Sequence, residues 1–393
     1  MPASVVSGRA WRRAAFTLFA VSAGTNVPTP LLIVYRERLD LGPDVLTALF
    51  GAYALGLVPA LFLAGPASDR FGRKRPVLGG TALAGLASLL LVAAASSLPL
   101  LFAGRLLQGA VSGIVFSACG AWLTDLSGAD AGPAAGRRAA VAMTGGFSLG
   151  PLVSGVLAQY GPAPTTLPYL LHVALVVAGL AAAASLPETV PVRLAGAAPP
   201  APGLLARAGD RRVLLTVLAP MSVWVFAFPT VVVSAVPLLV RTDAPPVLLT
   251  GVLAGLTLGT GTVAAPLQRR FQRWTAAVAC ATGVVGYLVA ATGAANGSPP
   301  VLLAAALLLG ASGGLMLAAG LALTARLARP DRRGTLGAVF YAFAYVGFGM
   351  PYVVAVGAAA SRVEVPLLVG AVVASLVLAR LVVATRRGDL GPA

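Results

Sequence analysis

The chain is 393 residues long; 58% of these residues are hydrophobic and only 10% are charged. A soluble protein of this length would carry about 25% charged residues, so ordinary globular and disordered classes are excluded and a protein that crosses a membrane many times is expected. The 28 basic and 12 acidic residues give a net charge of +16. Nucleic-acid-binding proteins share such a balance, so the positions of the charges decide what it means.

Twelve apolar stretches, each long enough to cross a bilayer, follow one another along the chain. A hydrocarbon core about 30 Å thick needs about 20 apolar residues per helix, and continuous rather than alternating hydrophobicity excludes a β-barrel. We therefore predict an all-α polytopic membrane protein with 12 transmembrane helices. In chain order the expected spans are Ala14–Tyr35, Val45–Gly65, Pro76–Ser96, Leu98–Leu123, Ala139–Tyr160, Leu167–Leu186, Val213–Val240, Pro246–Leu267, Trp274–Ala294, Pro299–Ala325, Gly334–Ala358 and Val363–Ala384.

The basic residues between these spans lie almost entirely in alternate connections. The exceptions are Arg36, Arg38, Arg241 and Arg362 on the other side, and Arg105 within the fourth span. Cytoplasmic connections hold the excess of Arg and Lys in membrane proteins. We therefore expect a multi-pass protein of the cell (inner) membrane with both termini in the cytoplasm. The positive charge is thereby explained by topology, and nucleic acid is not expected as a partner.

The two halves of the chain repeat one another at an offset of about 200 residues. A repeat of six spans returns the chain to the same side of the membrane, so we expect two parallel six-helix bundles with a substrate site near their interface. The expected domains are an N-terminal bundle over 1–190, a cytoplasmic linker over 191–212 and a C-terminal bundle over 213–393. The repeat is carried by Pro66, Arg70, Phe71, Arg73 and Pro151, which match Pro266, Arg270, Phe271, Arg273 and Pro351, and by Gly109 and Gly113, which match Gly310 and Gly314.

Several motifs in the first half resemble those of the major facilitator superfamily. The connection after the second span reads Gly65-x-x-x-Asp69-Arg70-x-Gly72-Arg73-Lys74, and the fourth span contains Arg105-x-x-Gln108-Gly109. The fifth span contains Gly146-x-x-x-Gly150-Pro151-x-x-Ser154-Gly155, and Leu186-Pro187-Glu188-Thr189 follows the sixth. Together they are most similar to the twelve-span drug/proton antiporter branch. The resemblance implies a transporter that works by alternating access.

The resemblance also implies a conformational latch at the cytoplasmic end of the first half. Its expected members are Gly65, Asp69, Arg70, Gly72 and Arg73, with Asp125 from the end of the fourth span. Glycines allow a tight turn, and an aspartate beside several cations can join helix ends by charge-assisted hydrogen bonds. The alternative is that the arginines only anchor the topology.

The fifth span is expected to be a bending interface helix. Pro151 removes a backbone hydrogen bond, while Gly146, Gly150 and Gly155 permit close helix packing. Plain packing explains the same residues equally well.

Polar and aromatic residues inside the spans are the candidates for substrate binding or coupling. A charged side chain within a span should face a cavity or a partner, which singles out Arg105, with Gln108 one turn away, although Arg105 could instead extend outward to the interface. Asn26 lies on a polar face of the first span and could line a cavity, although a hydrogen bond to another helix explains it equally well. Aromatic faces at Tyr341 and Tyr345 in the eleventh span, and around Trp224 in the seventh, suit flat apolar or cationic compounds, with core or lipid packing as the alternative.

The predicted function is proton-coupled efflux of a small apolar or amphipathic compound by a monomer without cofactor or metal. The alternative is an uptake symporter or uniporter of a small metabolite. Proton coupling follows from the resemblance alone, because every acidic residue lies at or beyond the end of a span. The single histidine, His172, is expected to be a packed structural residue. An enzyme is not expected: Gly310-Ala-Ser312-Gly-Gly314 matches a serine-nucleophile pattern, but it lies in a glycine-rich span rather than at a strand-to-helix turn.

Overall fold

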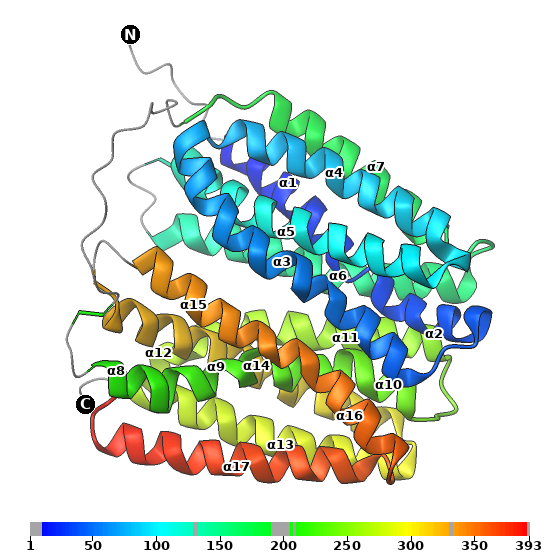
Figure 1. Cartoon of the computed structure of the whole chain (residues 1–393), viewed down its shortest axis with the longest axis vertical. Helices are drawn as coiled ribbons and strands as arrows, with labels where there is room; N and C mark the ends of the chain where they lie inside the picture. Colours follow the sequence, from blue (N-terminus) through cyan, green and yellow to red (C-terminus); the bar gives the residue numbers. More distant parts are fainter. Residues whose placement is uncertain (1–9, 129–132, 190–204, 207–209, 330–332, 391–393) are drawn as a thin grey trace. The chain divides into compact units, whose positions relative to one another are not determined.

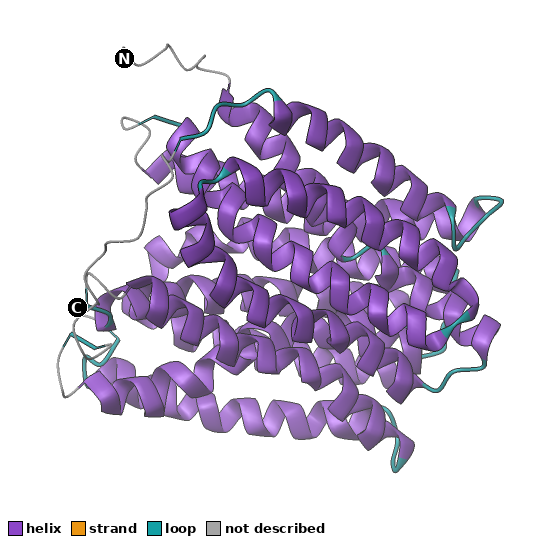
Figure 2. Cartoon of the chain, turned by 45° about the horizontal axis from the view of Figure 1, so that its top comes forward, coloured by secondary structure: helices purple, strands orange, loops and turns teal. Residues whose placement is uncertain are grey.

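The computed structural model describes residues 10–128, 133–189, 205–206, 210–329 and 333–390. Within them the regular structure is helical, and short loops join the helices (Figure 2). The first seven helices are α1 (Ala10–Thr25), α2 (Pro28–Leu39), α3 (Pro43–Phe71), α4 (Lys74–Ala93), α5 (Leu98–Leu126), α6 (Pro133–Tyr160) and α7 (Leu167–Ala184). The next ten are α8 (Asp210–Val213), α9 (Ala219–Thr230), α10 (Val236–Leu239), α11 (Pro246–Ala264), α12 (Gln268–Phe271), α13 (Thr275–Asn296), α14 (Pro299–Leu327), α15 (Arg333–Val346), α16 (Met350–Ala359) and α17 (Glu364–Arg386) (Figure 1).

Eleven helical stretches of the described residues are long and apolar enough to cross a membrane. One of them, Pro246–Asn296, contains both α11 and α13, so the described chain accommodates the twelve predicted crossings. The all-α prediction is confirmed. Many of these helices begin with proline, which fits the first turn because the amide it lacks has no partner there.

Contacts divide the chain into two compact units. One contains Met1–Leu41 and Ala52–Ala197, and the other contains Gly42–Gly51 and Ala198–Ala393. The first unit packs around Trp122, and the second around Phe228 and Tyr287, all of them almost completely buried. Both cysteines are buried and free.

Three predicted spans are interrupted in their interior rather than only at one end. The first divides into α1 and α2 next to Pro28. The seventh contains two π-helical segments, η3 (Leu214–Leu218) and η4 (Val231–Ala235), and the eleventh contains a 3-10 turn, Gly347–Gly349. Prolines and glycines at or near the interruptions explain most of them, because they remove hydrogen bonds or relax the backbone.

Glycines set the closest helix crossings in each unit. In the first, a Cβ atom added to Gly109 of α5 would overlap the carbonyl of Tyr53 on α3. In the second, a Cβ atom on Gly310 of α14 would overlap the carbonyl of Thr257 on α11. Gly113 and Gly314 make equivalent approaches one turn later. The glycines that carry the sequence repeat thus occupy corresponding helix crossings, as small residues do in membrane helix pairs.

Candidate functional site

Arg105 and Gln108 are buried on α5 and bind the backbone at the end of α1. Only 2% of Arg105 is exposed. Its Nη1 donates hydrogen bonds to the carbonyl of Thr25 at 3.0 Å and to Oε1 of Gln108 at 2.6 Å. Gln108 Nε2 donates to the carbonyl of Gly24 at 2.5 Å. The two side chains therefore act as one polar group directed at α1.

The break between α1 and α2 explains why these carbonyls need donors. In a continuous helix the carbonyl of Gly24 would accept from residue 28, but Pro28 has no amide hydrogen. The amide of Thr29 bonds the carbonyl of Asn26 at 3.0 Å rather than that of Thr25. The C-terminal end of a helix also carries partial negative charge, which favours a cation. Arg105 thus lies where the backbone supplies both acceptors and a favourable field.

A third helix contributes an aromatic face to the same cluster. The guanidinium carbon of Arg105 lies 5.0 Å from the centre of the Tyr53 ring, which comes from α3. A cation over an aromatic face is stabilised by the ring quadrupole, more strongly when water is excluded. Helices α1, α3 and α5 therefore meet at Arg105.

Polar side chains next to this cluster have no partner among the described residues. The hydroxyls of Thr25 and Thr29 are buried without a hydrogen bond there. Asn26, which is 9% exposed, lies at the break itself. Unsatisfied buried polar groups are uncommon in proteins and ask for an explanation, one of which is an absent water or ligand. The predicted candidates Asn26, Arg105 and Gln108 are thus brought to one place.

His172 is part of the packing between helices. Its Nε2 lies 3.0 Å from the carbonyl of Ala20, and its Nδ1 lies 2.7 Å from Oγ of Ser88. A carbonyl can only accept, so Nε2 carries a proton, and the Ser88 hydroxyl can donate to Nδ1. The ring also fills the space next to Gly24. No three His, Cys, Asp or Glu side chains gather as a metal site among the described residues.

The aromatic residues of the seventh span divide between two faces, rather than forming the single cluster expected around Trp224. Trp224 is buried, with its ring centre 4.9 Å from that of Phe228 and 6.2 Å from that of Tyr287. Phe226 points away from them and packs against Tyr345 of α15 at 4.7 Å. Residues two apart on a helix point in nearly opposite directions, so Trp224 belongs to the core of the second unit.

The expected aromatic face of the eleventh span is only partly formed. Tyr345 lies 5.2 Å from Phe348, ring centre to ring centre, and both contact Phe226. Tyr341 instead contacts Phe340 and the hydrophobic core, and Tyr352 is 46% exposed. The 3-10 turn at Gly347–Gly349 changes the helical repeat between Tyr345 and Tyr352. Phe226, Tyr345 and Phe348 are separate from the aromatic residues around Trp224. We call these three residues the aromatic cluster of the second unit.

The predicted interface helix packs closely on α1. Cβ atoms on Gly146 and Gly150 would overlap the backbone of α1 at Phe19 and Ala23. Pro151 lies inside α6, which runs on to Tyr160 without interruption. Ser154 Oγ donates a 2.7 Å hydrogen bond to the carbonyl of Val27 at the break. Gly155 is buried on the same helix.

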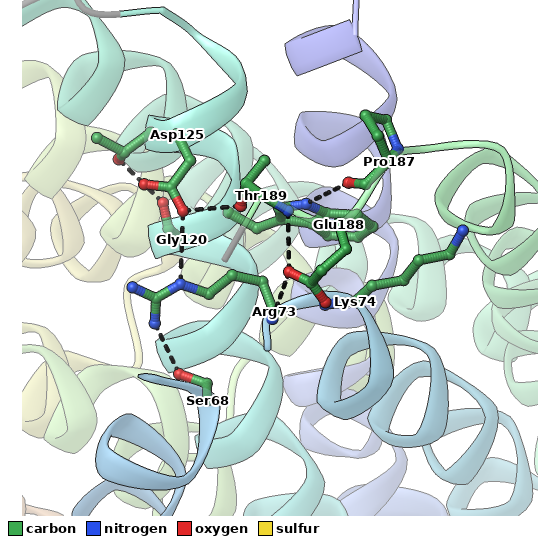
Figure 3. A network of polar contacts seen from close by, with 10 residues as sticks. Ser68, Arg73, Lys74, Gly120, Asp125, Pro187, Glu188 and Thr189 are labelled. Atoms are coloured by element: carbon green, nitrogen blue, oxygen red, sulfur yellow. Dashed lines mark hydrogen bonds and ion pairs between the residues drawn. The ribbon is translucent and has the colours of Figure 1, made fainter. Parts of the chain in front are cut away.

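Arg73 and Asp125 form an ion pair at the end of the first unit. The distance from Arg73 Nε to Asp125 Oδ2 is 3.5 Å, and the side chains are 15% and 35% exposed. Arg73 Nη1 also donates to Ser68 Oγ at 2.8 Å. One arginine thereby connects the end of α3, the start of α4 and the end of α5 (Figure 3).

The segment after α7 joins the same network. Glu188 accepts hydrogen bonds from the backbone amides of Arg73 and Lys74, both at 2.9 Å. Thr189 Oγ1 donates to Asp125 Oδ2 at 2.9 Å (Figure 3). Gly72 has φ +90°, and a Cβ atom there would overlap the Glu188 carboxylate. The amino end of a helix favours a carboxylate, so Glu188 caps the N-terminal end of α4.

The remaining predicted latch residues lie apart from the network or outside the described residues. Arg70 is exposed and lies over the ring of Phe71 at 5.2 Å. The side-chain surroundings of Asp69 and Gly65 lie outside the described residues. In the sequence Glu188 and Thr189 belong to the Leu186-Pro187-Glu188-Thr189 motif, and nothing in that motif alone assigns them to the latch. The signal for them was a carboxylate and a hydroxyl directly after a span that ends on the same side as Arg73.

Solved structures share this fold across nearly the whole chain. A peptide transporter POT in complex with sulfate gives a TM-score of 0.76 at 13% identity, covering 98% of this chain and 96% of that one. A POT family transporter in complex with 5-aminolevulinic acid gives 0.75 at 11% identity, covering 96% of each chain. The POT family transporter PepTSo gives 0.74 at 13% identity, covering both chains completely. At such low identities the likeness concerns the fold.

Curated relatives match only short segments. A triacylglyceride transporter of Mycolicibacterium hassiacum is 43% identical over 81 residues, which are 20% of this chain and 15% of that protein. The MFS-type transporter YceJ of Bacillus subtilis is 35% identical over 65 residues, 16% of this chain and 17% of that protein. The sequence profile described as Major Facilitator Superfamily matches residues 14–350. With its helical fold and twelve apolar crossings, the chain belongs to the Major Facilitator Superfamily and is a multi-pass membrane transporter rather than an enzyme.

Proposed function

We propose that this transporter exports a small apolar or amphipathic compound in exchange for protons by alternating access. The observation that carries the proposal is the polar cluster around Arg105. A buried arginine inside a span is costly, about 2.5–3.5 kcal/mol on the insertion scale. Here it is next to Asn26 and to Thr25 and Thr29, and the two threonine hydroxyls are buried without a hydrogen bond among the described residues. Such a cluster suits the polar end of an amphipathic compound.

The aromatic cluster of the second unit supports the apolar part of the assignment. The ring centres of Phe226, Tyr345 and Phe348 lie 4.7–5.2 Å apart, two pairs tilted and one edge-on. Aromatic faces receive flat apolar groups and organic cations. The direction of transport is supported by the resemblance of Gly146–Gly155 to the fifth-span motif of drug/proton antiporters.

The Arg73–Asp125 network supports a two-state mechanism. Exposed or half-exposed ion pairs are weak, about 0.2–1 kcal/mol, which is suitable for a contact that breaks and re-forms in each cycle. In the proposal Gly65, Asp69, Arg70, Gly72, Arg73 and Asp125 act as the latch, to which we add Glu188 and Thr189. These residues hold the ends of α3, α4 and α5 together in one of the two states.

Flux measurements in proteoliposomes test the direction and the coupling. The compound is first identified as one that accumulates less in cells that contain the protein than in cells that lack it. In vesicles with an acidic lumen, proton exchange should drive this compound inward, and dissipating the gradient with a protonophore should stop its accumulation. Flux that is indifferent to the gradient would establish a uniporter.

Uptake of a small polar metabolite is the second candidate. The guanidinium of Arg105 pairs well with carboxylates. Among the solved structures that share the fold, one is a peptide transporter and another is a transporter in complex with 5-aminolevulinic acid. A symporter would accumulate its substrate when the lumen is alkaline, opposite to an exchanger. The same vesicles therefore separate the two functions.

A further inference from the structure

A cavity of about 200 Å³ lies between the start of the seventh span and α17 in the second unit. Its apolar walls include Pro220, Val373, Leu376 and Val377. Val373 and Leu376 are 46% and 69% exposed, so the cavity opens on the outer surface of its helices. In a chain that spans a membrane, such an apolar exposed surface faces lipid.

The π-helical segment η3 helps to shape this cavity. Thr216 and Val217, which line it, belong to η3. A π turn adds a residue to the helical turn and often occurs at functional sites. In this structure Thr216, at the wall of the cavity, belongs to this π-helical segment.

Arg380 lies at the wall of the cavity and within a membrane span. Its Nη2 donates a 2.7 Å hydrogen bond to Thr216 Oγ1, and that hydroxyl donates to the carbonyl of Arg212 at 2.8 Å. Among the described residues Arg380 forms no ion pair with a carboxylate. Asp389, near the end of the same chain segment, pairs with Arg212 at 3.1 Å. A guanidinium has five N–H donors, so several remain for a ligand.

The end of the unit nearest Arg380 carries further exposed cations. The first turn of α8 and the C-terminal end of α17 lie together there (Figure 1), joined by the contact between Arg212 and Asp389. Arg211 in α8, Arg386 and Arg387 are exposed at this end. By the expected topology this is the cytoplasmic end, where basic pockets between membrane helices bind anionic head groups.

We propose that the groove binds one anionic phospholipid of the cytoplasmic leaflet. Its phosphate bonds Arg380, and an acyl chain lies along Pro220, Val373 and Leu376. The apolar walls argue for a lipid rather than a free anion, and the surrounding positive charge argues for a lipid with net negative charge. The proposal does not depend on what the transporter carries.

Native mass spectrometry of the purified full chain tests this binding. The protein is titrated with dioleoylphosphatidylglycerol and, separately, with dioleoylphosphatidylcholine. We expect tighter retention of the anionic lipid and about a tenfold loss of it in Arg380→Gln. Arg362→Gln is the matched control, because Arg362 is exposed just before the other end of α17, and it should leave retention unchanged.

Two further measurements keep the result unambiguous. Arg380→Lys retains the charge and should recover part of the binding, whereas a loss caused by misfolding would not be recovered and would lower the unfolding temperature in phosphatidylcholine. Inorganic phosphate at millimolar concentration should not displace the lipid. Equal retention of both lipids, unchanged binding in Arg380→Gln, or displacement by phosphate would each overturn the proposal.

Discussion

The carboxylate of Glu188 holds the backbone amide of Arg73 at 2.9 Å, although the two residues are 115 positions apart. The same arginine pairs with Asp125 through its side chain. The main chain of Arg73 therefore holds the segment after α7, and its guanidinium holds the end of α5. This arrangement makes the segment after α7 part of the Arg73–Asp125 network.

Replacing Glu188 by Gln should weaken the start of α4. The loss of a capping group costs about 1 kcal/mol, so the unfolding temperature in detergent should fall slightly, and transport should fall with it. Glu37→Gln is the control, because Glu37 is exposed on α2. If the two variants unfold at the same temperature, Glu188 has no capping role.

Replacing Asp125 by Asn should change transport more than stability. The pair with Arg73 is half-exposed and contributes at most about 1 kcal/mol, equivalent to about a fivefold change in the balance of two states. We expect initial transport rates to fall by that order, with normal membrane insertion. Asp69→Asn should reduce transport more severely if Asp69 is a latch member; full activity of that variant would remove Asp69 from the latch.

Arg105→Lys should abolish most transport while Arg105→Ala should also destabilise the protein. A lysine keeps the charge but lacks the planar fork that reaches both Thr25 and Gln108. Alanine leaves the acceptors without a donor, which costs about 1–3 kcal/mol. Vesicle flux and thermal unfolding measure the two effects, and near-normal flux in Arg105→Lys would contradict a specific role for the guanidinium.

Gly109→Ala should destabilise the first unit by about 1–3 kcal/mol, because the new Cβ atom would overlap the carbonyl of Tyr53. Gly120→Ala on the same helix meets open space and should be neutral or stabilising, since alanine favours helix. Thermal unfolding of both variants gives the comparison. Equal effects would mean that α3 and α5 do not approach closely at Gly109.

Gln272→Gly should stabilise the second unit. Gln272 has φ +45°, at the position 200 residues after Gly72, which has φ +90°. A non-glycine residue in such a conformation costs about 1–3 kcal/mol. Chemical unfolding should show a net gain of about 1 kcal/mol after glycine's own entropy is subtracted, whereas Gly72→Ala should show a loss.

Hydropathy and charge were sufficient to predict the helices, because apolar length and loop charge are local properties of the sequence. The partners of Arg105 could not be predicted, because they are backbone carbonyls on another helix. Glu188 was overlooked as a latch residue since its contact with Arg73 depends on how α4 and α7 pack. The division of Trp224 from Phe226 follows from helical geometry and was available in the sequence.

The break between α1 and α2 has a consequence for biosynthesis. The carbonyls of Gly24, Thr25 and Val27 receive hydrogen bonds from Gln108, Arg105 and Ser154, which lie in the fourth and fifth spans. Unsatisfied backbone groups are costly in lipid. We therefore expect the first span to reach its final packing only after the fifth span has been synthesised, when all three side-chain donors are present.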